Sequence, residues 1–123
     1  CLIPGRKYSR NIRVTRIVDT FLEHARVWYF GNGGKPKLFL GSPDWMRRNL
    51  YRRIEAVTPI LDPDLKRELS DMLSIQLSDK RKACFVDDHL RNRWKSARPQ
   101  KEKVRAQYTF YEYLKSGELR VES

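Results

Sequence analysis

The sequence predicts an α/β fold in which helices pack on a mixed β-sheet. Three observations indicate this class: apolar residues at helical spacing over 14–22, short apolar segments on both sides of Asn32-Gly33-Gly34, and an Asp-Pro helix start at 62–63. Helical and strand patterns alternate along the chain, as expected when helices cover a sheet. A length of 123 residues is ordinary for one domain, so we expect a single domain over 1–123.

The first half is predicted to contain a helix, a hairpin and a strand. Apolar residues at i, i+3, i+4, i+7 and i+8 predict an amphipathic helix that Asn11 caps and that ends near His24: Val14, Ile17, Val18, Phe21 and Leu22. Segments 27–30 and 37–40 predict two strands, because the Asn-Gly-Gly sequence between them favours a hairpin turn. Alternation over 53–59 predicts a further strand.

The second half is predicted to contain two helices, a strand and a loop. Asp62 should cap a helix that starts at Pro63. Its expected buried face consists of Leu65, Leu69, Met72 and Leu73. Segment 82–86 predicts a strand, and the Pro99-containing segment 91–105 predicts a basic loop. A last helix is expected from about Lys103 to near Gly117. Its inner face should consist of Val104, Tyr108, Tyr111 and Leu114.

The charge of the chain indicates a polyanionic partner. A formal net charge of +11 suits nucleic acid, an anionic membrane surface or a chain of phosphates, although part of the excess can simply solubilise the surface. No apolar segment approaches the ~20 residues of a membrane helix. Cys1 and Cys84 lack metal-ligand spacing, so we expect free thiols. Because the chain starts at Cys1 without a Met, we expect a domain of a larger protein.

His24 and Arg26 are the first candidate site residues. In an extended chain, residues two apart point the same way, so an imidazole and a guanidinium could meet one phosphate group. The histidine could then attack or transfer a proton while the arginine holds the oxygens. Taken by itself, this spacing fits a surface histidine at a helix end more often than a catalytic one.

Arg53 and Glu55 share a predicted strand face in the same way. The arginine could bind phosphate while the glutamate orients it or contacts a ribose or a metal, but an ordinary cross-strand ion pair is the simpler interpretation. Basic residues that could contact a polyanion are Arg48, Arg91, Arg93 and Lys95. Trp94 lies among them, which also suits single-stranded nucleic acid.

Taken together, these segments resemble the C-terminal domain of long-chain bacterial polyphosphate kinase. The resemblance is carried by Ile17-Val18-Asp19, Phe21-Leu22-Glu23-His24, Arg26-Val27, Asn32-Gly33-Gly34, Ser42-x-Asp44-Trp45-Met46-x-Arg48-Asn49, Arg53-x-Glu55, Asp62-Pro63-x-Leu65-Lys66 and Val104-Arg105-Ala106-Gln107. It covers nearly the whole chain. It implies a phospholipase D-like fold and an enzyme that reversibly transfers the terminal phosphate of ATP to polyphosphate through a phosphohistidine.

The resemblance also implies roles for residues. The phosphorylated histidine would belong to the preceding domain, and His24 would be the second histidine, which lines the ATP phosphate site as a general acid or base. Arg26, Arg53 and Glu55 would line the same site. Mg²⁺ would be held mainly outside this chain, so no metal site is expected in it. Pro43 departs from the family pattern, because it has no N–H to offer to a phosphate.

Further expectations concern partners and location. The partners implied are ATP or ADP, inorganic polyphosphate and the preceding domain of the same polypeptide, in a homo-oligomeric cytoplasmic enzyme that requires no nucleic acid. Peripheral association with the inner membrane stays open. The isolated chain is expected to be inactive. Two alternatives remain: a module that binds nucleic acid or another polyanion without chemistry, and a phospholipase D-like phosphodiesterase.

Overall fold

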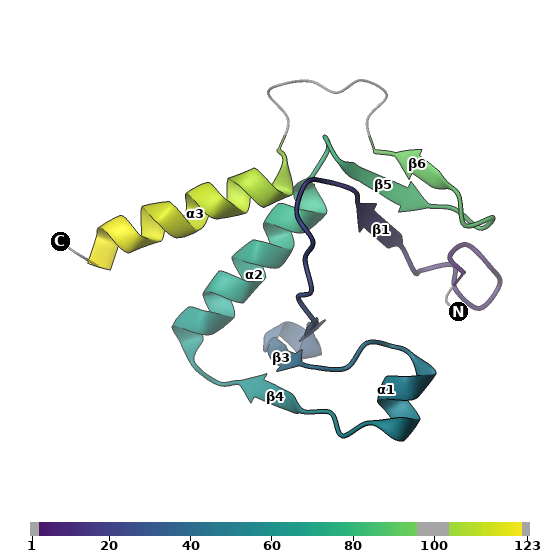
Figure 1. Ribbon diagram of the computed structural model, residues 1–123, viewed down its shortest axis with the longest axis horizontal. Coiled ribbons are helices and arrows are strands. Elements are labelled where there is room, and N and C mark those ends of the chain that lie inside the picture. Colours follow the sequence, from purple (N-terminus) through teal and green to yellow (C-terminus); the bar gives the residue numbers. More distant parts are fainter. Residues whose placement is uncertain (1–2, 96–103, 122–123) are drawn as a thin grey trace. The chain divides into compact units, whose positions relative to one another are not determined.

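The computed structural model describes residues 3–95 and 104–121, with side chains up to residue 117 in the last segment (Figure 1). The predictions for Cys1, Arg98, Pro99, Lys101 and Lys103 lie outside the described residues. The chain divides into two compact units: Leu22–Ser70, and a second unit formed by the segments up to Phe21 and from Asp71 onward. Each unit contains its own antiparallel three-stranded sheet.

The Leu22–Ser70 unit is built on the predicted hairpin. Strands β2 (Val27–Phe30) and β3 (Lys37–Gly41) pair antiparallel, and β4 (Val57–Ile60) pairs with the other side of β3. The single 3-10 turn Asn32–Gly34 joins the first two strands with φ values of 45°, 59° and 87°. Asparagine and glycine tolerate this left-handed region best, which confirms the turn prediction.

Short segments around this sheet complete the unit. Helix α1 (Arg47–Arg52) follows β3, and α2 (Pro63–Ser78) begins after β4. Asp62 caps α2 by accepting hydrogen bonds from the backbone N–H groups of Asp64 and Leu65, as predicted. The predicted strand over 53–59 was only partly right, because pairing with β3 starts at Val57.

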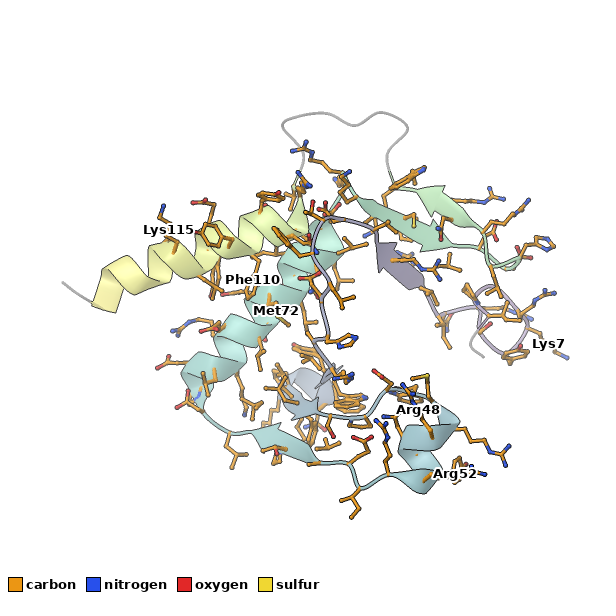
Figure 2. The ribbon with its side chains drawn as sticks, viewed as in Figure 1. Lys7, Arg48, Arg52, Met72, Phe110 and Lys115 are labelled. Atoms are coloured by element: carbon orange, nitrogen blue, oxygen red, sulfur yellow. The ribbon has the colours of Figure 1, made fainter. Side chains whose placement is uncertain are left out.

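The other unit contains the sheet β1–β5–β6 and helix α3. Its elements are β1 (Val14–Ile17), β5 (Ala83–Val86), β6 (Asn92–Trp94) and α3 (Ala106–Val121). All the strand pairs are antiparallel, and Figure 1 shows β5 and β6 as neighbours at the end of a tight turn. Its buried apolar residues are Met72, Ala83, Cys84, Val86 and Ala106. Figure 2 marks Met72 on α2.

Asp79 connects three elements of this unit. Its carboxylate is fully buried, and Oδ1 accepts hydrogen bonds of 2.8, 2.7 and 3.0 Å from the N–H groups of Arg81, Lys82 and Ala83. Oδ2 accepts a 2.7 Å bond from the N–H of Ala106. One side chain therefore holds the end of α2, the start of β5 and the start of α3 together.

Several element predictions were wrong. The helix over 11–24 is the strand β1 followed by irregular chain, because the β-branched residues 14, 15 and 17 pair with β5 in the register Val14↔Val86 to Ile17↔Ala83. Residues 92–94 of the predicted loop form β6. The last helix continues through Gly117 to Val121. Four residues expected on buried faces are exposed: Leu65, Tyr108, Tyr111 and Leu114.

Candidate functional site

Arg26 is positioned by the start of the hairpin. The N–H of Gly41 donates a 3.1 Å hydrogen bond to the carbonyl of Arg26, which extends the β2–β3 pairing by one residue. The Arg26 side chain donates from Nε to Asp44 Oδ1 at 2.7 Å, and a weaker bond runs from Nη1 to the His24 carbonyl at 3.5 Å. The guanidinium is therefore fixed in direction by residues on both sides of the hairpin.

Glu55 is held by two hydrogen bonds, one on each carboxylate oxygen. Ser42 Oγ donates to Oε2, and Asn49 Nδ2 donates to Oε1 at 2.7 Å. Ser42 is itself fixed by residue 56, because its N–H donates to the Ala56 carbonyl at 3.0 Å and its Oγ accepts from the Ala56 N–H at 3.1 Å. The carboxylate of Glu55 therefore has a single defined orientation.

The carboxylates of Asp44 and Glu55 interact electrostatically with the cationic residues predicted for the site. The hydrogen bond from Arg26 lowers the pKa of Asp44, with smaller effects from the charges of His24 and Arg48. The hydrogen bonds from Ser42 and Asn49 lower the pKa of Glu55, and the charges of Arg53 and Arg26 lower it further. Both groups therefore remain ionised at neutral pH.

The structure brings together the predicted residues that lie in this unit. His24 and Arg26 precede β2, Arg48 projects from α1 (Figure 2), and Arg53 and Glu55 lie between α1 and β4. His24, Arg48 and Arg53 are exposed, whereas Arg26 and Glu55 are half-buried. The cationic side chains can reach an anionic ligand, and the carboxylates hold the group in place.

Three of the predicted polyphosphate contacts have partners in the other unit. Arg91 and Arg93 each donate from Nε to Asp87 Oδ2 at 3.0 Å. Hydrogen bonds hold the pKa of Asp87 far below its usual range, and the bond from the backbone N–H of Arg91 has the largest effect. Lys95 Nζ donates to the Leu77 carbonyl at 2.9 Å and lies 5.2 Å from the centre of the Phe85 ring. These contacts give the three cations structural roles within their own unit.

Asn49 and Ser42 hold Glu55, a role that the sequence did not predict for either residue. Both stand in the segment that carries the family resemblance, but their spacing from Glu55 gives no local signal. Contact between residues 42, 49 and 55 arises only when α1 folds between β3 and β4.

The part of the chain that the structure describes contains neither a candidate metal-binding cluster nor a helix able to span a membrane. In the residues that the structure describes, no three His, Cys, Asp or Glu side chains form a group that could hold a metal ion. The carboxylates of Asp44 and Glu55 are already bound by protein donors. No helix in the same part of the chain is long and apolar enough to cross a membrane.

Comparisons with known proteins agree with one another. The family model described as polyphosphate kinase C-terminal domain 2 matches residues 1–107. The polyphosphate kinase of Escherichia coli K12 is 49% identical over 118 residues, which are 95% of this chain and 17% of that protein. The polyphosphate kinase of Synechocystis is 52% identical over 84 residues, which are 68% of this chain and 12% of the relative.

A solved structure extends the likeness to three dimensions. The crystal structure of polyphosphate kinase from Porphyromonas gingivalis matches with a TM-score of 0.90 and 54% identity, over 98% of this chain and 18% of that one. The α/β, phospholipase D-like fold class expected from the sequence is confirmed. Fold and relatives together define a domain of the kind found in polyphosphate kinases.

The chain belongs to the polyphosphate kinase family, as its C-terminal domain 2. It spans less than a fifth of the length of the relatives named above.

Proposed function

We propose that this chain supplies the ATP-phosphate half of the active site in a polyphosphate kinase that reversibly transfers the terminal phosphate of ATP to polyphosphate. The observation that carries the proposal is the electrostatic group of the Leu22–Ser70 unit, in which the charges of His24, Arg26 and Arg53 act on the carboxylates of Asp44 and Glu55. A phosphate chain needs several fixed cations and a group that can move a proton, and these residues supply both.

Each residue has a role in this proposal. His24, exposed beside Arg26, acts as general acid or base at the transferred phosphate. Arg26 and Arg53 neutralise the phosphate oxygens as negative charge shifts towards ADP. The Glu55 carboxylate, as a fixed negative charge, stabilises the positions of the two guanidinium groups. Arg48, which acts on Asp44 from α1, contacts the polyphosphate chain.

The remaining parts of the proposal concern the larger enzyme. The phosphorylated histidine lies in the preceding domain of the same polypeptide, and the complete enzyme is a cytoplasmic homo-oligomer that uses Mg²⁺ held by that domain. Residues 1–123 act as one domain within it. Magnesium supplies charge neutralisation on the phosphates when it is bound. No role in holding it is assigned to Asp44 or Glu55, whose oxygens are occupied.

Replacement of His24 in the full-length enzyme tests the proposal. His24→Ala is expected to abolish ATP-dependent polyphosphate synthesis, or to reduce kcat by roughly 10²- to 10⁴-fold, because a positioned proton-transfer group is lost. His89→Ala is the matched control, since His89 is also exposed but lies in the other unit. Wild-type synthesis by His24→Ala would remove His24 from the mechanism. If the wild type shows no synthesis, and His24→Ala binds polyphosphate as well as the wild type does, a non-catalytic polyanion-binding module would be favoured.

A further inference from the structure

Asn49 is a polar residue at a buried position of α1. Its exposed fraction is 5%, and its Nδ2 donates the 2.7 Å hydrogen bond to Glu55 Oε1. Its other amide atom, Oδ1, is also buried and has no hydrogen-bond partner in the described structure. An unpaired buried acceptor is costly, and an apolar side chain of similar size avoids that cost. Packing alone therefore does not account for an asparagine at this position.

The orientation of the Asn49 amide follows from its partner. An ionised carboxylate can only accept hydrogen bonds, so the NH₂ end of the amide must face Glu55 and the oxygen must point away. Turning the amide over would place two acceptors against each other at hydrogen-bond distance. The unpaired Oδ1 is therefore a direct consequence of the bond from Nδ2 to Glu55.

Two different segments of the chain fix the Glu55 carboxylate. Asn49 on α1 binds one oxygen, and Ser42, next to β3, binds the other. The charged groups that act on this carboxylate are Arg53, from the segment before β4, and Arg26, from the segment before β2. Arg26 is in turn paired with Asp44. Loss of one hydrogen bond would let the carboxylate turn about the other.

We propose that Asn49 is a positioning residue that fixes the orientation of the Glu55 carboxylate in the ATP-phosphate site. This inference rests on the proposed function. In this proposal Asn49 acts through Glu55 and does not itself contact the reacting groups.

Two variants of the full-length enzyme separate positioning from packing. Asn49→Leu keeps the number and branching of the side-chain heavy atoms and removes the unpaired acceptor, so the enzyme should fold while kcat/KM for ATP falls about tenfold, as for the loss of a hydrogen bond to a charged group. Asn49→Asp keeps the shape but places a second carboxylate against Glu55. It should move the acid limb of the pH profile of kcat/KM to higher pH.

The direction of the pH effect follows from the pKa of Glu55. Hydrogen bonds from Ser42 and Asn49 lower that pKa in the wild type, so ionised Glu55 persists to lower pH than an ordinary glutamate. A neighbouring carboxylate raises the pKa of at least one member of the pair. The active ionised form is then lost earlier as the pH falls. Asn11→Asp adds the same charge at an exposed position and should leave the acid limb unchanged.

A double-mutant cycle tests whether Asn49 acts through Glu55. In a Glu55→Gln background, Asn49→Leu should cost little further activity, because the partner carboxylate is already gone. Additive losses would overturn the proposal, as would an unshifted acid limb in Asn49→Asp, or an Asn49→Leu enzyme that is unfolded by circular dichroism. If the wild-type enzyme lacks polyphosphate synthesis, the proposed function fails. If the wild type is active and the Asn49 variants match it, only this inference fails.

Discussion

Some N–H donors of the Arg26 guanidinium are bound by acceptors of the protein itself. Nε binds Asp44, and Nη1 lies 3.5 Å from the His24 carbonyl. A guanidinium carries N–H donors on each of its nitrogens, so donors remain at Nη2 for a phosphate oxygen. Under the proposed function, the planar guanidinium would bind Asp44 and a phosphate oxygen at the same time, which a point charge alone could not do.

Arg26→Lys in the full-length enzyme tests this use of the planar guanidinium. Lysine keeps the positive charge but cannot bind Asp44 and a phosphate in the same planar geometry, so kcat/KM for ATP should fall about tenfold. Steady-state kinetics with ATP and polyphosphate measure the effect. Arg52→Lys, on the exposed side of α1, is the control and should match the wild type. Full activity of Arg26→Lys would mean that Arg26 contributes only its charge.

At the scale of elements, Gly41 lets three strands of the Leu22–Ser70 unit pack closely. A Cβ atom at position 41 would lie 2.6 and 2.8 Å from ring atoms of Trp28 on β2, and 3.0 Å from Cγ2 of Val57 on β4. The two distances to Trp28 are shorter than real carbon contacts allow, and the indole cannot move away as a flexible chain end would. The residue that follows, Ser42, is one of the two donors to Glu55.

Gly41→Ala is therefore expected to destabilise the chain by about 1–3 kcal/mol, the usual cost of overpacking. Urea denaturation followed by tryptophan fluorescence measures the free energy of unfolding. Gly31→Ala is the matched control, because nothing lies within 4 Å of its Cβ position and its φ of −64° suits alanine. An unchanged stability for Gly41→Ala would show that the strands can separate to accept the methyl group.

Elements with a local signal were predictable, and those held by distant partners were not. The hairpin at Asn32-Gly33-Gly34 and the start of α2 at Asp62-Pro63 follow from turn and cap chemistry within a few residues. Segment 14–17 has apolar residues that fit a helix as well, and only pairing with β5, nearly seventy residues away, makes it a strand. Periodicity over so short a segment does not distinguish these outcomes.

At the scale of the whole chain, the proposed catalytic group of the Leu22–Ser70 unit is incomplete for phosphoryl transfer through a phosphohistidine. The described residues contain one histidine in this unit, His24, and one, His89, in the other. The family resemblance assigns the phosphorylated histidine to a preceding domain, and the chain covers 17% of its E. coli relative. In the proposed function His24 moves a proton and is not the phosphorylated residue, so this unit by itself would bind phosphates without transferring them.

The isolated 123-residue chain is thus expected to show no ATP-dependent polyphosphate synthesis while it still binds polyphosphate. Its net charge of +11 should make this binding weaken steeply with salt. Product assays with labelled ATP, and binding measured between 50 and 200 mM salt, check the two parts. Turnover by the purified chain would contradict the assignment of the nucleophile to another domain.

The candidate site divides in the same way as the fold. His24, Arg26, Arg53 and Glu55 could be selected from the sequence because their motifs, taken together, match a known family pattern. Their partners could not be selected, because Ser42 and Asn49 meet Glu55 only through the path of α1. Arg91 and Arg93 show the opposite case: their charge was evident, but their pairing with Asp87 was not.

The sequence by itself determined the α/β class, the hairpin, the start of α2, the positive charge and the family. Each of these depends on composition or on residues near one another in the chain. Only the tertiary structure decided that segment 14–17 is a strand, that Arg26 is held by Asp44, and that Asn49 holds Glu55. The physical reason is that these hydrogen bonds join residues far apart in the sequence. Such residues become neighbours only when the whole chain folds, and no local pattern of residues specifies that.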